Sequence, residues 1–136
     1  MSNVDKLRAA YKAWHDTRGK SADVWLDLIA DDVTLKSLAD GAPEMEFSAT
    51  RRGKDAVRAY FADLDKEWEM QFYHADEFVA EGDRVVVIGR CGWKHKGTGK
   101  VAESPTFTYW KFRDGKAAEF FEFYDTAKAF AAARPA

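Results

Sequence analysis

The hydrophobic pattern of this 136-residue chain changes its period once, near Trp68. Before that point apolar residues recur at helical spacing in three segments, and after it they alternate with a period of two. The three helical stripes are Leu7, Tyr11 and Trp14; Val24, Trp25, Leu28 and Ile29; and Val57, Tyr60, Phe61 and Leu64. Ser2 with Asp5 predicts a capping box for the first helix. A helical half followed by a strand-rich half predicts an α+β fold.

Turn residues divide the second half into four strands. Gly82-Asp83, Gly97-Thr98-Gly99 and Asp114-Gly115 separate strands predicted at residues 69–80, 84–96, 100–113 and 116–124. An earlier strand is predicted at residues 33–38, a loop at 39–52 and a closing helix at 126–133. Because antiparallel strands of this length twist strongly, we expect a cone-shaped curved sheet wrapped around the N-terminal helices, with a pocket at its open end. The chain shows no repeat or linker, so we expect one domain over residues 1–136.

Composition narrows the function classes. A net charge of -2 argues against nucleic acid as a partner, and the lack of 18 consecutive apolar residues argues against a membrane span. The N-terminus has no apolar signal core, so we expect a cytoplasmic protein. The single cysteine, Cys91, excludes an internal disulfide. Aromatic residues make up 15% of the chain, which indicates either a dense core or a small-molecule pocket walled by rings.

Three segments of the sequence resemble a known superfamily. VWLDLIADDVTL, RRGKDAVRAYFADL and YWKFRDGKAAEFFEFYDTAKAF, in this order, are similar to SnoaL-like and ketosteroid-isomerase-like proteins of the nuclear-transport-factor-2-like superfamily. The resemblance implies a cystatin-like α+β barrel, a small-molecule ligand, no cofactor and a homodimer. It does not select a reaction, because the superfamily includes isomerases, cyclases, hydrolases, dehydratases and non-catalytic binders.

Comparison with the ketosteroid isomerases leaves two of their three catalytic roles unfilled. The slot of their carboxylate base falls on Ser37, and the slot of their protonated acid falls on Thr108. The slot of their tyrosine donor falls near Lys12, one residue from Tyr11. Because neither a serine nor a threonine hydroxyl replaces these carboxyl groups, the resemblance predicts no steroid isomerisation by that mechanism.

The closing segment is also similar to limonene-epoxide hydrolase-like proteins, which activate water with an Asp-Arg-Asp trio. Asp125 and Arg90 match two positions of that trio, and Gly92 stands where the second aspartate belongs. We therefore expect Arg90 and Asp125 to converge inside the cone. They form either a catalytic pair that anchors a polar group of the ligand, with Asp125 as the acid or base, or an ion pair that only supports the fold. A third alternative is that one of the two residues faces solvent.

Other residues are assigned to the wall of the pocket. The predicted ligand-binding set is Tyr11, Trp14, Ser37, His74, Thr108, Trp110 and Phe123. The three histidines are too scattered to predict a metal site. Phe107, Tyr109, Phe120 and Tyr124 are expected on an uncovered sheet face, which predicts a homodimer through that face.

Two functions remain open at the level of sequence. The first is a small enzyme that acts as an isomerase, cyclase or hydrolase by acid/base chemistry on a mostly apolar, partly polar organic ligand, with Arg90 or Tyr11 stabilising charge. The second is a non-catalytic ligand-binding or dimerisation module of the same fold.

Overall fold

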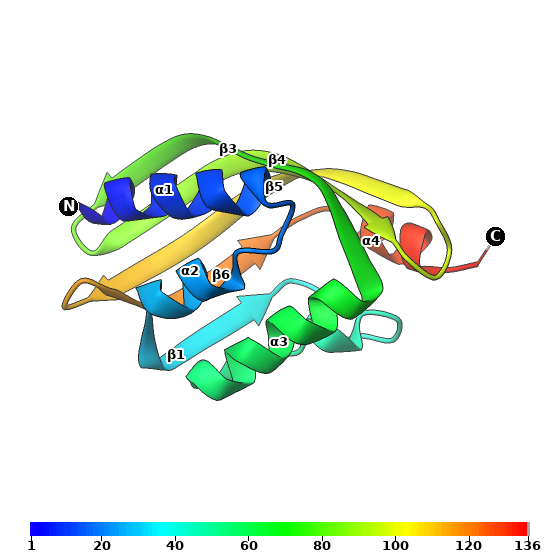
Figure 1. The fold of residues 1–136 in the computed structure, drawn as a ribbon, viewed down its shortest axis with the longest axis horizontal. Helices are drawn as coiled ribbons and strands as arrows, with labels where there is room; N and C mark the ends of the chain where they lie inside the picture. Colours follow the sequence, from blue (N-terminus) through cyan, green and yellow to red (C-terminus); the bar gives the residue numbers. More distant parts are fainter. Residues whose placement is uncertain (136) are drawn as a thin grey trace.

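An antiparallel meander of four strands forms most of the molecule. It consists of β3 (Trp68–Glu81), β4 (Arg84–His95), β5 (Val101–Arg113) and β6 (Lys116–Phe123). The strands follow one another through the predicted turns, as Figure 1 shows. The structure is a computed structural model and describes residues 1–135.

The first strand, β1 (Ile29–Ser37), pairs with the last strand rather than with a neighbour in sequence. The order in the six-stranded sheet is β2-β1-β6-β5-β4-β3, and β1 runs parallel to β6 while all other pairs are antiparallel. The segment predicted as a loop at 39–52 holds a 3-10 turn, η1 (Glu46–Ser48), and the short edge strand β2 (Arg51–Arg52). The α+β prediction is confirmed, with a curved sheet that stays open between its edges β2 and β3.

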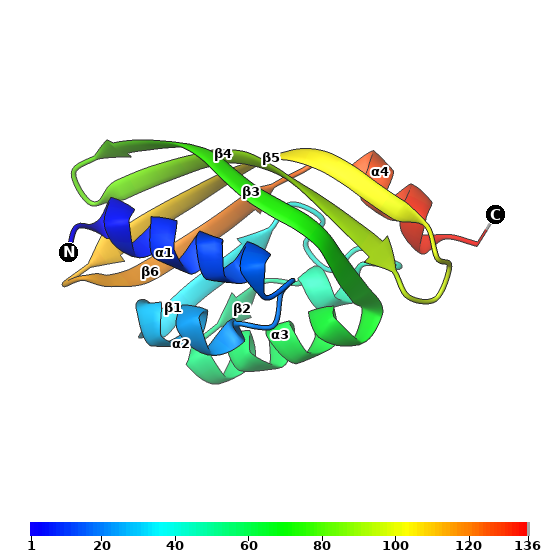
Figure 2. The ribbon, with the colours of Figure 1, turned by 45° about the horizontal axis from the view of Figure 1, so that its top comes forward.

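Three helices cover one face of the sheet, which we call the inner face (Figures 1 and 2). They are α1 (Asn3–Asp16), α2 (Ala22–Leu28) and α3 (Lys54–Glu67). The predicted capping box begins α1: the Asp5 backbone N–H donates to Ser2 Oγ at 3.0 Å, and the Ser2 N–H donates to the Asp5 carboxylate. The predicted apolar stripes are the buried ones, including Leu7, Trp14 and Val57.

The closing helix α4 (Thr126–Ala133) follows β6 and packs against β5. Its buried residues are the alanines Ala129, Ala132 and Ala133. Thr98 Oγ1 from the β4–β5 turn donates to the Ala132 carbonyl at 2.6 Å. Small side chains therefore let this helix approach the sheet closely at one end of the molecule (Figure 2).

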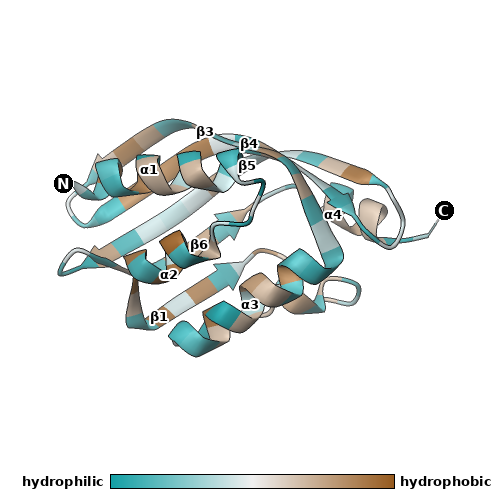
Figure 3. Ribbon diagram, in the orientation of Figure 1, coloured by the Kyte–Doolittle hydropathy of each residue, from teal (hydrophilic) through white to brown (hydrophobic). Residues whose placement is uncertain are grey.

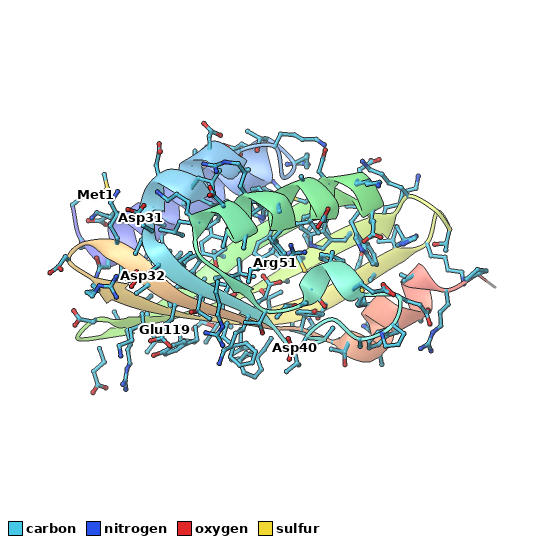
Figure 4. All side chains as sticks on the ribbon, turned by 90° about the horizontal axis from the view of Figure 1, so that it is seen from below. Met1, Asp31, Asp32, Asp40, Arg51 and Glu119 are labelled. Carbon is cyan, nitrogen blue, oxygen red and sulfur yellow. The ribbon has the colours of Figure 1, made fainter. Side chains whose placement is uncertain are left out.

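Strand residues alternate between the inner face and the opposite, outer face. In β5, Thr106, Thr108 and Trp110 are buried, whereas Phe107 between them is 50% exposed. Hydrophobic segments lie along β3 and β4 in Figure 3, and Figure 4 shows Glu119 on the side of the sheet away from the helices. The core therefore sits between the inner face and α1, α2 and α3.

Within residues 1–135, no helix is both long enough and apolar enough to cross a membrane.

Candidate functional site

A cavity of about 120 Å³ lies between the inner face and the helices. Twelve aromatic side chains line it: Tyr11, Trp14, Trp25, Phe47, Tyr60, Phe61, Trp68, Tyr73, Trp93, Trp110, Phe120 and Tyr124. Among the described residues that line it, two carry a carboxyl group, Glu122 and Asp125. A space of this volume holds several water molecules. The high aromatic content thus builds both the core and the walls of a cavity.

Glu122 places a carboxyl group among these rings. It lies on β6 in the middle of the sheet, opposite Thr108 on β5 and beside Ser37 on β1. Tyr73 Oη donates a hydrogen bond to Glu122 Oε2 at 2.7 Å. Burial raises the pKa of Glu122 above its ordinary value, and the bond from Tyr73 opposes part of that rise. Glu122 therefore keeps its proton to a higher pH than an exposed glutamate does, because its carboxyl group lies in an apolar space.

Two further hydrogen bonds join polar groups in the wall of the cavity. Trp110 Nε1 donates to Tyr11 Oη at 3.0 Å, and the hydroxyl groups of Ser37 and Tyr124 are 2.5 Å apart. Burial raises the pKa of Tyr11, so it stays protonated at neutral pH. The rings of Tyr11 and Tyr73 stack with centroids 5.6 Å apart. This packing holds Tyr73 in place against Glu122.

Two further polar groups border the cavity. Burial raises the pKa of the Cys91 thiol, and the nearby charge of Glu122 raises it further, so the thiol is protonated and unreactive. The indole Nε1 of Trp68 is buried and has no hydrogen-bond partner among residues 1–135. Cys91 faces inward, as its position next to the outward-facing Arg90 requires.

The predicted convergence of Arg90 and Asp125 is wrong. Arg90 points to the outer face, where its side chain is 58% exposed and its Nε donates to Asp76 Oδ2 at 3.3 Å. The inward positions of β4 are Val85, Val87 and Cys91, which puts Arg90 on the other side of the sheet.

Asp125 lies at the border of the cavity and caps α4. Its Oδ1 accepts the Lys128 backbone N–H at 3.1 Å, and its own N–H donates to Ser104 Oγ at 2.8 Å. A side chain that caps a helix start stabilises that helix. Its geometry thus fits a structural role, and the carboxyl group among the aromatic rings of the cavity is that of Glu122.

The other predicted ligand-binding residues divide into three groups. Tyr11, Trp14, Ser37 and Trp110 line the cavity. Thr108 is buried on the inner face but does not line it. His74 and Phe123 do not reach it either.

His74 lies against His15 of α1, with ring centroids 4.3 Å apart. Phe123 is 42% exposed on the outer face and stacks on Phe121. Within the part of the chain that the structure describes, no three His, Cys, Asp or Glu side chains gather as metal ligands would.

Sequence reasoning missed Glu122 because it assigned the wrong face to part of β6. Phe120 and Tyr124 line the cavity and do not belong to the outer face, as was predicted for them. The signal was available in EFFEFYD: Phe120, Glu122 and Tyr124 alternate and therefore share a face. An acid between two inward aromatic residues is the pattern that indicates this site.

Solved structures of the same fold cover nearly the whole chain. An NTF2-like protein of unknown function from Burkholderia pseudomallei K96243 is 28% identical, with a TM-score of 0.84 over 97% of this chain and 98% of its own. TerC, co-crystallised with polyporic acid, is 23% identical, with a TM-score of 0.81 over 96% and 97% of the two chains.

A protein with a ketosteroid isomerase-like fold from Catenulispora acidiphila DSM 44928 was solved in complex with trimethylamine. It is 20% identical, with a TM-score of 0.73 over 96% of this chain and 93% of its own. No curated protein matches the chain. The sequence model of the SnoaL-like domain matches residues 7–120, so the chain belongs to the SnoaL-like domain family.

Proposed function

We propose that this protein binds a mostly apolar small organic molecule in the inner cavity and that Glu122 transfers a proton to or from it. The observation that carries the proposal is one carboxyl group enclosed by aromatic rings and held by Tyr73. Small-molecule sites combine such apolar walls with a few placed polar groups. Two relatives of this fold were crystallised with small organic molecules, which supports the same use of the cavity here.

The surroundings of Glu122 favour general acid/base catalysis. Burial raises the pKa of Glu122, and a carboxyl group whose pKa lies closer to the working pH is a better acid and base for proton transfer. The bond from Tyr73 fixes the direction of the carboxylate and stabilises its ionised form. A reaction that moves a proton between two atoms of one ligand, as an isomerase or cyclase does, needs no other charged group at the site.

A substrate that any positioned base can convert tests this proposal. In 5-nitrobenzisoxazole a base removes the ring C–H proton, the C–H electron pair forms a nitrile, and the N–O bond breaks to release a coloured nitrophenolate. We expect the protein to accelerate this elimination, with a rate that rises with pH as Glu122 ionises. We expect Glu122→Gln to abolish the acceleration, because an amide does not accept the proton.

The matched control is Glu119→Gln, the same change on the same strand but on the outer face. It should keep the wild-type rate. Equal rates for the wild type and Glu122→Gln would contradict the catalytic proposal. If ligands still bound to such a protein, the second function, a non-catalytic ligand-binding module, would replace it.

We further propose that the outer face forms a homodimer. Phe107 and Phe123 are 50% and 42% exposed there, and Phe121 lies beside Phe123 under the ammonium group of Lys36. Large contiguous apolar patches on a protein surface mark sites of interaction with other molecules. Sedimentation of the protein at micromolar concentration should give about twice the monomer mass of 15.4 kDa, and Phe107→Glu should reduce it to one monomer. A wild-type monomer would contradict this interface.

A further inference from the structure

The charges around the cavity have one sign. Among the side chains that line it, Glu122 and Asp125 carry carboxyl groups. Within residues 1–135, the lining contains no lysine, arginine or histidine. Arg51 of β2 is bound to other groups: its Nη2 donates to Asp63 Oδ2 at 3.1 Å and to the Phe47 carbonyl at 2.9 Å. The cavity therefore contains a negative group without a cation of its own.

The aromatic rings of the wall add to the negative potential in the cavity. Tyr11, Trp25 and Trp110 pack together, with Tyr11 and Trp25 centroids 4.9 Å apart and Trp25 and Trp110 stacked at 5.3 Å. Phe120 lies 4.7 Å from Trp110, on the same strand as Glu122. The faces of aromatic rings carry partial negative charge and attract cations, most strongly where water is excluded.

The carboxylate of Glu122 and the aromatic rings together favour or disfavour a ligand according to its charge. An anionic ligand would meet the carboxylate of Glu122 in a medium of low dielectric, where repulsion is strong. A neutral apolar ligand would displace water from that carboxylate and leave it with Tyr73 as its one donor. A cation pairs with the carboxylate and rests against the rings at the same time.

We propose that the ligand of this cavity is an organic cation, an amine or ammonium group on an apolar body, with its positive charge against Glu122. The inference rests on the proposed use of the cavity for a small molecule, but it does not depend on proton transfer. It adds a ligand class to the site and assigns charge selection to Glu122.

An isosteric pair of probes isolates the charge. The cation 3-hydroxyphenyltrimethylammonium and the neutral 3-tert-butylphenol have the same shape and differ in one atom, nitrogen against carbon. Isothermal titration calorimetry measures the dissociation constant of each. For the wild type we expect the cation to bind about tenfold more tightly or better. For Glu122→Gln we expect the two constants to become equal, while Glu119→Gln keeps the wild-type ratio. Thermal melting of each variant confirms that it is folded.

Three other outcomes of the binding experiment would each overturn the inference, and each would do so for a different reason. Equal or tighter binding of 3-tert-butylphenol by the wild type would exclude a cation site, and 5-nitrobenzisoxazole turnover would still decide on proton transfer. A cation preference that survives in folded Glu122→Gln would place the cation elsewhere. Binding of neither probe would reject the ligand class altogether.

Discussion

Removing the Tyr73 hydroxyl tests the central contact of the site. Tyr73→Phe deletes the 2.7 Å bond to Glu122 Oε2 and leaves the stacked ring in place. A hydrogen bond to a charged group contributes about 1.5–3 kcal/mol, and one between neutral groups about 0.5–1.5 kcal/mol. We expect the variant to lose about 1.5–3 kcal/mol of unfolding free energy where Glu122 is ionised, and less where Glu122 is protonated.

The difference between the two pH ranges has a definite sign. Because the ionised carboxylate loses more than the neutral acid, the pKa of Glu122 rises further in Tyr73→Phe. Urea unfolding at several pH values from about 4 to 9 measures the loss of stability, and the pH midpoint of 5-nitrobenzisoxazole turnover measures the pKa. A destabilisation that does not grow with pH, or a midpoint that moves down, would refute the assigned bond.

Three further changes test other parts of the structure. A buried acid with a raised pKa lowers the stability of the folded state as pH rises from its unfolded pKa through its folded pKa. In urea titrations Glu122→Gln should therefore become more stable relative to the wild type as pH rises. A difference in unfolding free energy that does not change with pH would contradict the burial of this group. Gly89→Ala would put a Cβ atom 1.9 Å from the His74 carbonyl oxygen, and we expect it to lower the unfolding free energy by about 1–3 kcal/mol or more; a loss near zero would show that the two strands do not approach so closely. Arg90→Ala breaks an exposed ion pair and should cost about 0–1 kcal/mol, with turnover unchanged; a large loss of activity would return Arg90 to the site.

The sequence predicted most of the architecture because local rules determine it. The capping box at Ser2, the apolar stripes of α1 and α3, and the Asp114-Gly115 turn each specify a short segment through nearby contacts. The pairing of β1 with β6 joins segments about 85 residues apart, as Ser37 opposite Glu122 shows, and no local pattern encodes such a partner.

The candidate site was predicted less well because the face on which a strand residue lies depends on where the alternation of the strand begins. A shift of one residue exchanges the inner and outer faces, which moved Phe123 inward and Phe120 and Tyr124 outward in the prediction. The resemblance to limonene-epoxide hydrolase-like proteins placed the acid on Asp125, three residues past the carboxyl group that lines the cavity. The wall residues Tyr11, Trp14 and Trp110 were found because helical spacing and β5 alternation set their direction correctly.

The position of β6 has a consequence for how the chain acquires its shape during synthesis. This strand, which is synthesised after the other five strands of the sheet, lies between β1 and β5 and hydrogen-bonds to both. Until it emerges, the N-terminal strand pair and the β3–β4–β5 hairpins are two unconnected pieces of sheet. The strand that joins them also carries Glu122, so the growing protein gains the acid of its cavity in the same step that completes its sheet.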